Sequence, residues 1–167
     1  SKESFLHYSN VKNLDTKKEI AKITRVLCCS GKIYYELLDK KVADKREDVA
    51  IVRLEQLYPF PKKKVDAIIE KYGEADWFWV QEEPSNMGAW SYIHAFYRKY
   101  DLKLIARKSS ASPATGFKKV HESQQESIIQ AAFGAGKGSF TTKVLQTASK
   151  KSKKTKSNKT DDFTKLK

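Results

Sequence analysis

The stretch Arg25-Val-Leu-Cys-Cys-Ser-Gly-Lys-Ile-Tyr-Tyr-Glu-Leu-Leu-Asp-Lys-Lys-Val42 decides the fold class of this chain. Its first five residues form a compact apolar run that ends at Ser30-Gly31, which predicts a buried strand followed by a turn. From Ile33 to Val42 the apolar side chains recur at helical spacing, which predicts an amphipathic helix. A buried strand that enters a helix through a glycine turn is typical of α/β proteins.

The same alternation of strand and helix continues downstream. Further apolar strands are predicted at residues 48–53, 76–81 and 102–106, and further helices at residues 63–72, 89–100 and 120–133. Because the strands are apolar on both faces, they predict a mostly parallel sheet that helices cover on both sides. We therefore expect an α/β domain over residues 20–134. A lead-in segment at residues 1–19 precedes it, and Lys17 to Ile23 is compatible with a short helix.

Most of the excess positive charge lies after this domain. Residues 137–167 contain ten Lys and two Asp, so they supply +8 of the net charge of +13. Gly, Lys, Ser and Thr dominate beyond Gly134, which predicts a Lys-rich, disordered tail over residues 135–167. Such a tail could contact nucleic acid or an acidic protein surface. Since its aromatic residues are limited to Phe140 and Phe163, we favour a solvated tail and expect no nucleic-acid partner.

Composition also argues against several classes of protein. No apolar run approaches the roughly 18 to 20 residues of a membrane span, and residues 1–10 lack the apolar core of a secretory signal. The chain begins with Ser1, which fits an excised segment. Cys28 and Cys29 are adjacent, so a bond between them would be strained, and a reducing compartment is expected. The spacing of the cysteines does not match a structural zinc site.

Two groups of residues are candidates for binding an anion. Ser30-Gly31-Lys32 lies between a strand and a helix, where free N–H groups next to a lysine suit a phosphate or a carboxylate. Arg25 and Arg53 flank two parallel strands that we expect to be neighbours, which would place two guanidinium groups near Lys32. The alternatives are that Ser30 only caps the helix and that the arginines pair with acids such as Glu36 and Glu55.

Other residues carry weaker expectations. Glu82 and Glu83 end a strand, where a general base could stand, but a polar contact between domains or subunits, or a helix cap, is the simpler interpretation. His121 at a helix start is interpreted as a structural hydrogen-bond donor, and the three tryptophans as core or interface residues. We find no nucleophile with an adjacent base. The residues alone thus indicate an α/β domain with a possible anion pocket and no complete active site.

Four blocks of this sequence resemble the C-terminal domain of the E1 component of 2-oxoglutarate dehydrogenase. They follow the order and spacing of that family within residues 24–134. The blocks are Cys29-Ser-Gly-Lys-Ile-Tyr-Tyr-Glu-Leu-Leu38, Val49-Ala-Ile-Val-Arg-Leu-Glu-Gln-Leu-Tyr-Pro-Phe-Pro61, Trp79-Val-Gln-Glu-Glu-Pro-Ser-Asn-Met-Gly-Ala-Trp90, and Ala111-Ser-Pro-Ala-Thr-Gly116 followed by His121. The pyruvate and branched-chain E1 β subunits share the fold but not these strings.

The resemblance implies a fold and a reaction. The fold would be a three-layer α/β/α sandwich with a mostly parallel sheet, like the transketolase C-terminal domain. The full enzyme would be a homodimer that decarboxylates 2-oxoglutarate, or a close homologue such as 2-oxoadipate, and passes the acyl group to the lipoyl arm of the E2 component. Its thiamine diphosphate and Mg²⁺ would be bound by earlier domains. This chain would then hold no catalytic residue and would be an inactive structural and regulatory domain when alone.

The resemblance further implies an effector, either an adenine nucleotide or acetyl-CoA. Arg25 and Arg53 are the first candidates for binding its phosphates, followed by Lys32 and Arg107. Two other functions remain open, namely a stand-alone nucleotide- or acyl-CoA-binding module and a nucleic-acid binder that uses the basic tail. The expected compartment is the cytoplasm in a bacterium or the mitochondrial matrix in a eukaryote, with no membrane partner.

Overall fold

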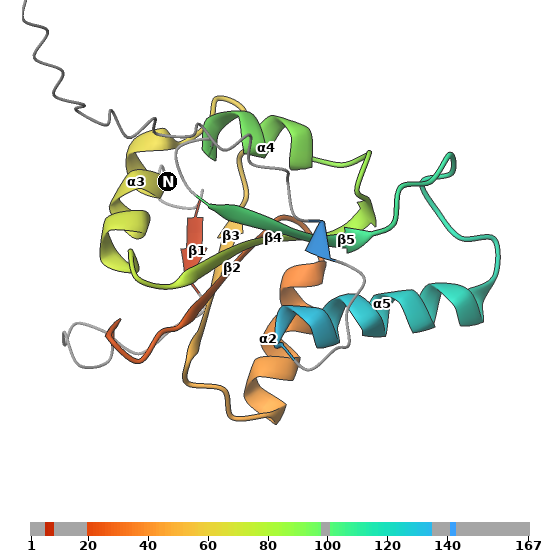
Figure 1. The fold of residues 1–167 in the computed structure, drawn as a ribbon, viewed down its shortest axis with the longest axis horizontal. Helices are drawn as coiled ribbons and strands as arrows, with labels where there is room; N and C mark the ends of the chain where they lie inside the picture. Colours follow the sequence, from red (N-terminus) through yellow and green to blue (C-terminus); the bar gives the residue numbers. More distant parts are fainter. Residues whose placement is uncertain (1–5, 9–19, 98–100, 135–140, 143–167) are drawn as a thin grey trace, which may run out of the picture.

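The computed structural model describes residues 6–8, 20–97, 101–134 and 141–142 (Figure 1). The predicted alternation of four strands and four helices is confirmed, and most boundaries differ by one or two residues. The last three residues of the predicted helix 89–100, and the first three residues of the segment Lys17 to Ile23, lie outside the described residues. In chain order the elements are β1 (Leu6–Tyr8), β2 (Arg25–Cys29), α2 (Ile33–Ala43), β3 (Val49–Leu54), α3 (Lys62–Lys71), β4 (Asp76–Pro84), α4 (Trp90–Tyr97), β5 (Leu102–Arg107), α5 (Lys118–Ala132) and β6 (Thr141–Thr142).

One mixed sheet runs through the molecule in the order β1-β3-β2-β4-β5-β6. The four central strands are parallel to one another, while β1 and β6 pair antiparallel with the outer parallel strands. The prediction of an α/β fold with a mostly parallel sheet is therefore confirmed. The sequence did not predict β1 and β6, because strands of three and two residues are too short to show an alternating pattern.

Helices cover both faces of the sheet. Figure 1 shows α3 and α4 on one side and α2 and α5 on the other. The strand order explains this, since the chain steps from β2 outward to β3 and then back past β2 to β4 and β5. Right-handed crossovers that run in opposite directions place their helices on opposite faces. The direction reverses between the neighbouring strands β2 and β4, which makes their carboxyl ends the switch point where α/β sheets commonly bind ligands.

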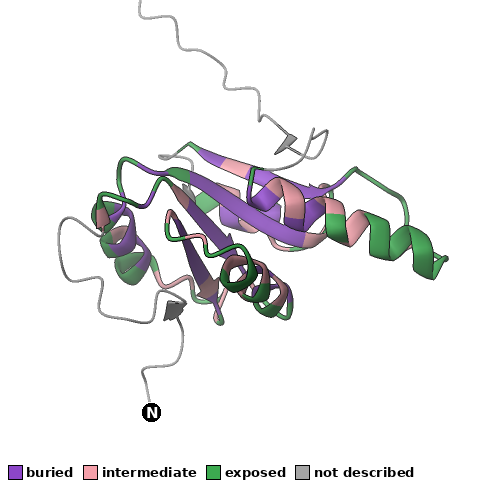
Figure 2. Cartoon of the chain, turned by 90° about the horizontal axis from the view of Figure 1, so that it is seen from below, coloured by how far each residue is buried: buried purple, intermediate pink, exposed green. Residues whose placement is uncertain are grey.

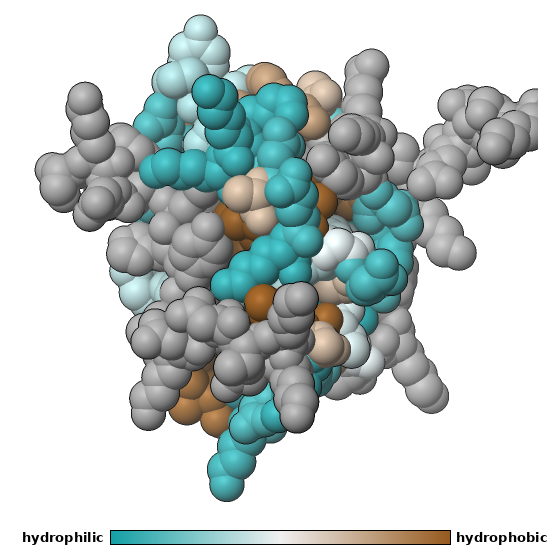
Figure 3. All heavy atoms as spheres, turned by 90° about the vertical axis from the view of Figure 1, so that its left-hand side faces the viewer, coloured by the Kyte–Doolittle hydropathy of each residue, from teal (hydrophilic) through white to brown (hydrophobic). Residues whose placement is uncertain are grey.

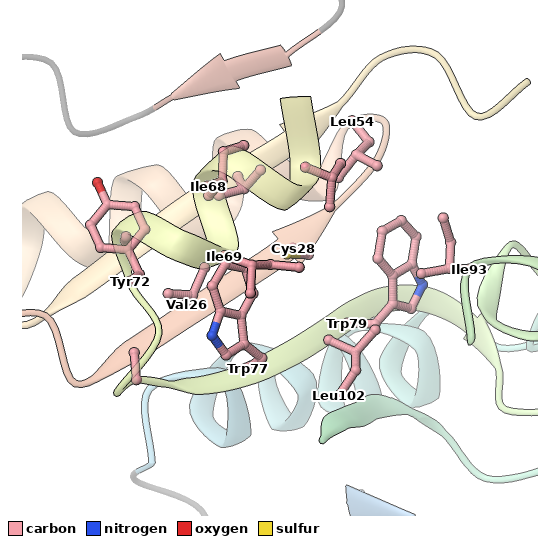
Figure 4. Packing of buried hydrophobic residues seen from close by; sticks show 14 of the residues in the cluster. Val26, Cys28, Leu54, Ile68, Ile69, Tyr72, Trp77, Trp79, Ile93 and Leu102 are labelled. Atoms are coloured by element: carbon pink, nitrogen blue, oxygen red, sulfur yellow. The ribbon is translucent and has the colours of Figure 1, made fainter. Parts of the chain in front are cut away.

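Two apolar clusters hold the layers together, one on each face. Figure 4 shows part of the first, where Trp77 and Trp79 of β4 lie with Cys28 of β2 and Ile93 of α4. The interpretation of the tryptophans as core or interface residues is confirmed, because all three are buried. The second cluster packs α2 and α5 against the opposite face and includes Cys29. The two cysteines thus face opposite clusters, and both are buried and free.

Helix α5 and the face that carries α3 both expose polar residues to solvent. In Figure 2 the N-terminal half of α5 extends from the body and is exposed, whereas most of its C-terminal half is intermediate or buried. Figure 3 views the side on which α3 lies, and hydrophilic side chains predominate among its coloured atoms, with hydrophobic ones visible between them. Within the described ranges, no helix is both long and apolar enough to cross a membrane.

Candidate functional site

The carboxyl ends of the four parallel strands bring most of the predicted polar residues to one edge of the sheet. Lys32 follows β2, Arg53 lies near the end of β3, Glu82 lies near the end of β4, and Arg107 ends β5. Strand β4 runs three residues past its predicted end, and its pairing with β5 is irregular between Val80 and Pro84. Glu82 therefore lies within the extended C-terminal part of β4, next to the switch point.

Lys32 is neutralised by carboxylates at the switch point. Its Nζ lies 2.9 Å from Glu82 Oε1 and 3.6 Å from Glu36 Oε1. Gln125 of α5 joins the same group, because its Nε2 donates to Glu36 Oε2 at 2.8 Å and to Glu82 Oε1 at 3.0 Å. The hydrogen bond to Glu82 raises the pKa of Lys32. One lysine and two carboxylates leave this cluster with net negative charge, which opposes binding of a phosphate.

The turn at Ser30-Gly31 differs in part from its predicted role. Gly31 has a φ of +74°, a backbone conformation that glycine adopts without strain. Ser30 does not cap the helix, since Lys32 occupies the N-cap position of α2 and no side chain makes a capping hydrogen bond there. The interpretation of Ser30 as the cap is therefore wrong. The glycine turn serves to bring Lys32 over Glu82 of the neighbouring strand.

Arg53 also has an acidic partner. Its Nε lies 2.6 Å from Glu55 Oε1, although the contact does not have the angles of a hydrogen bond and Nε remains without one. Its Nη1 donates to the Tyr35 hydroxyl at 3.1 Å, which raises the pKa of Arg53. The guanidinium carbon also lies 5.1 Å from the ring centroids of both Tyr34 and Tyr35. The alternative prediction that Arg53 pairs with Glu55 is thus confirmed.

Arg25 lies at the amino ends of the parallel strands, whereas the other three candidate residues lie at the carboxyl ends. In the parallel register Arg25 pairs with Val49 and Cys29 with Arg53, so four strand positions, or about 13 Å, separate the two arginines along the sheet. The expectation that both would stand near Lys32 was wrong. Neighbouring parallel strands had been predicted correctly, but the two arginines occupy the start of one strand and the end of the other.

The guanidinium of Arg25 instead caps the C-terminus of α5. Its Nη1 donates to Ala131 O at 3.2 Å and to Ala132 O at 2.9 Å. Arg46 adds a third contact, because its Nη1 donates to Phe133 O at 2.8 Å. The last carbonyls of a helix have no partner within the helix and carry negative partial charge, so two guanidinium groups stabilise this end. Partial burial lowers the pKa of Arg25.

Arg107 differs from the other cations at the carboxyl edge. It is 8% exposed, and its Nε donates to Glu82 O at 2.7 Å while Nη2 donates to Pro113 O. In the part of the chain that the structure describes, no carboxylate forms an ion pair with it. Its charge is therefore met by carbonyl dipoles only. Beside it lies a cavity of about 440 Å³ lined by Arg107, Lys108, Ser109, Ser110, Ala114, Thr115 and Gln124.

Several residues that organise this edge were not selected from the sequence. Gln81 is 4% exposed and accepts from Trp79 Nε1 at 2.9 Å, while its Nε2 donates to Met87 O at 2.8 Å. These bonds hold the loop between β4 and α4 against the core. A glutamine within the apolar run of a predicted buried strand was the available signal, because a buried amide requires hydrogen-bond partners. Gln124 and Gln125 gave no such signal, since a helix rich in polar residues normally presents them to water.

For Glu82, the interpretation as a residue that makes a polar contact is confirmed in part. The carboxylate of Glu82 makes a polar contact within this domain, because it contacts Lys32 at the start of α2 and Gln125 of α5. His121 is exposed, and its backbone N–H donates to Phe117 O at 3.0 Å. Across the described ranges, no group of three or more His, Cys, Asp or Glu is arranged to hold a metal ion.

The fold and the contacts at the carboxyl ends of its strands define the class of protein. It is a parallel α/β domain whose polar residues gather at the switch point and beside Arg107. A sequence profile of the family described as "2-oxoglutarate dehydrogenase C-terminal" matches residues 2–133. The chain is 45% identical over 125 residues to the oxoglutarate dehydrogenase of Buchnera aphidicola subsp. Baizongia pistaciae, covering 71% of this chain and 13% of that protein. It is 44% identical over 132 residues to the 2-oxoglutarate dehydrogenase E1 component of Azotobacter vinelandii, covering 74% and 14% respectively.

A third relative is the 2-oxoglutarate dehydrogenase E1 component of Rickettsia conorii, which is 43% identical over 128 residues, or 71% of this chain and 14% of that protein. The chain therefore belongs to the 2-oxoglutarate dehydrogenase C-terminal family, as the resemblance predicted. It spans about a seventh of the length of these relatives. The comparisons give no support to a stand-alone binding module or to a nucleic-acid binder.

Proposed function

We propose that this chain acts as the C-terminal domain of an E1 component that decarboxylates 2-oxoglutarate and transfers the succinyl group to the lipoyl arm of an E2 component. The observation that carries the proposal is the family match over residues 2–133 together with 43–45% identity to E1 components and an oxoglutarate dehydrogenase. The domain would contribute structure and regulation, while the reaction would take place on segments outside it. A second copy of the enzyme would complete a homodimer.

The cofactors of the proposed reaction do not fit the described residues. Thiamine diphosphate needs a bound divalent cation, and such a cation takes several oxygen ligands. The acidic pair at the switch point, Glu36 and Glu82, is already engaged by Lys32 and Gln125. With no cluster of three or more metal-ligand side chains in the described ranges, we assign thiamine diphosphate and Mg²⁺ to other parts of the enzyme and route no step through this chain.

The same proposal includes an effector site for an adenine nucleotide or acetyl-CoA. Of the four predicted phosphate-binding residues, Arg107 has the strongest support, because it is buried beside a cavity and lacks an ion-pair partner among the described residues. Lys32 and Arg53 have acidic partners, and Arg25 is occupied with helix carbonyls. We place the enzyme in the cytoplasm of a bacterium or in the mitochondrial matrix of a eukaryote.

Immunodepletion tests the proposal directly. An antibody against this chain is used to clear an extract of the source cells, and 2-oxoglutarate-dependent reduction of an artificial electron acceptor is then measured. The expected result is that activity leaves the extract with the captured protein, whereas a non-immune antibody removes none. Full activity after complete removal of the chain would refute the assignment to the E1 enzyme.

A further inference from the structure

The segment Leu57-Tyr-Pro-Phe-Pro-Lys-Lys-Lys64 and Phe96 of α4 form one surface of exposed rings and lysines, the aromatic–lysine patch. We propose that this patch packs against an acidic segment of the E1 polypeptide that lies outside this chain. The inference rests on the proposed function, which makes the chain one domain of a longer polypeptide, and it deepens that function by naming a contact surface. Three features carry it, namely fixed but exposed rings, lysines without a role in the fold, and the small size of the patch.

The aromatic part of the patch is held in place by the domain and is still open to solvent. Phe60 packs against the first apolar cluster, and its ring stacks on the ring of Phe96 with centroids 4.7 Å apart. Within the loop, Gln56 Nε2 donates to Pro59 O at 3.3 Å. Tyr58 is nevertheless 82% exposed and Phe96 is 44% exposed. Large rings that gather on a surface and remain in water are typical of a contact surface whose partner is absent.

The charged part of the patch does not stabilise the fold. Lys62, Lys63 and Lys64 occupy the first turn of α3, where the helix dipole disfavours cations. Lys62 pairs with Asp66, but Lys63 is exposed and forms no ion pair within the residues that the structure describes. Since no acidic residue occurs from Leu57 to Lys64, the ammonium groups give the patch a positive charge that attracts carboxylates.

Charge disfavours the other occupants of this patch. A second copy in a symmetric contact would use the same surface twice and place lysines opposite lysines. Residues 137–167 of this chain carry +8, so the patch repels them as well. A nucleic acid needs a positive groove that follows several nucleotides, whereas α3 continues with Asp66 and Glu70 after its first turn. An acidic polypeptide with an apolar side chain for the exposed rings fits best.

The size of the patch indicates where the acidic segment comes from. A stable interface between separate proteins involves about 20–30 residues on each side, far more than Leu57 to Lys64 and Phe96 provide. A partner on the same polypeptide is present at high effective concentration, so that a small patch is sufficient to hold it. The chain spans about a seventh of the length of its relatives, which leaves most of an E1 polypeptide to supply that partner.

Cross-linking of the native protein tests the contact. The polypeptide that carries this chain is purified from the source cells, treated with a carbodiimide that joins amines to carboxylates, and digested for mass spectrometry. The expected product links Lys62, Lys63 or Lys64 to an Asp or Glu outside these 167 residues, and it migrates as a single polypeptide on a denaturing gel. Links of these lysines only within this chain, only to another protein, or to nothing would overturn the proposal.

Two surface variants separate a contact surface from a solvated face. In the 167-residue chain, Tyr58→Ser and Lys63→Glu change exposed side chains, so the melting temperature should stay the same or rise. In the full-length polypeptide each should lower the melting temperature by about 1 °C or more, because the contact is lost. The matched controls Val42→Ser and Lys45→Glu change exposed residues at the end of α2 and should have no effect in either protein.

Two results of the variant experiment would overturn the proposal. One is an unchanged melting temperature of the full-length polypeptide, and the other is an equal loss in the 167-residue chain, which would show a role inside the domain. The immunodepletion judges the proposed function separately. Activity can leave the extract while these lysines form no cross-link, and the cross-link can form in a polypeptide that lacks the activity.

Discussion

Replacement of Arg25 by Met separates the capping role that the structure shows from the phosphate-binding role that the sequence predicts. The structure makes Arg25 a cap of the α5 C-terminus, through bonds of 3.2 and 2.9 Å to Ala131 O and Ala132 O. Its guanidinium also lies 4.4 Å from the ring centroid of Phe78. Methionine keeps much of the apolar stem of the side chain but removes both hydrogen bonds and the charge. A loss of stability is therefore expected without a loss of phosphate binding.

The magnitude follows from the contacts that are removed. Hydrogen bonds from a charged donor contribute about 1.5–3 kcal/mol each, and the two bonds to α5 share one nitrogen and are only partly buried. Adding about 0.3–1 kcal/mol for a cation at a helix C-terminus gives an expected loss of about 2–4 kcal/mol in the free energy of unfolding. The quantity is measured by urea unfolding of the full chain, followed by the fluorescence of its buried tryptophans.

Lys22→Met is the control for this prediction. Lys22 also forms an ion pair, at 4.0 Å from Glu47, but the two side chains are 64% and 84% exposed. Solvent screening leaves such pairs with about 0–1 kcal/mol, so this variant should be close to wild type. Arg25→Lys should fall between, because it keeps the charge but not the forked donor. If Arg25→Met were no less stable than Lys22→Met, the capping role would be refuted.

Three further predictions concern stability and reactivity. Gly88→Ala should destabilise the chain by about 1–3 kcal/mol in urea unfolding, since Gly88 has a φ of +70° and its added Cβ would lie 3.0 Å from the Gln81 side chain; an unchanged midpoint would contradict this. Burial raises the pKa of Cys29 to about 12, so a disulfide reagent should label the native thiol slowly at pH 8 and quickly after unfolding in urea. Hydrogen bonds from Arg46 lower the pKa of Asp48, so this carboxylate adds stability above its ordinary pKa that is lost as pH falls through its folded value. The Asp48→Asn variant should accordingly lose less stability than the wild type as the pH falls from about 5 to 2. Parallel curves of unfolding free energy against pH for the two proteins would contradict the stabilising role of the Arg46–Asp48 ion pair.

The sequence predicted the parallel core of the fold because each central strand carries its own local signal. Runs such as Val49–Leu54 are apolar on both faces, and each is bounded by turn residues and followed by helical periodicity. The edge strands carry no comparable signal, since β1 and β6 are defined by their partners in the sheet and not by their own composition. The Lys-rich segment at residues 135–167 and the lead-in at residues 1–19 fall largely outside the described residues, so the predicted division of the chain stays a prediction.

For the candidate site, the sequence predicted which cationic residues lie there but not which residues they contact. Lys32, Arg53 and Arg107 were selected as cations, and the parallel sheet does bring all three to its carboxyl edge. The sequence could not show that Lys32 faces two carboxylates from different elements, because one of them, Glu82, is 50 positions away in the chain. Long-range partners of this kind decide charge balance, and periodicity does not encode them.

Charge balance explains why the strongest candidate for an anion site is not the switch point itself. In a doubly covered parallel sheet the crevice between β2 and β4 has the geometry of a ligand site, but here Lys32, Glu82 and Gln125 fill it with contacts that tie α2, β4 and α5 together. The same arrangement keeps the Glu82 carboxylate away from Arg107 and offers Arg107 only the backbone carbonyl. The ion pair at the switch point thus leaves Arg107 without a carboxylate partner among the described residues, which is why we propose it as the first candidate for the effector's phosphate.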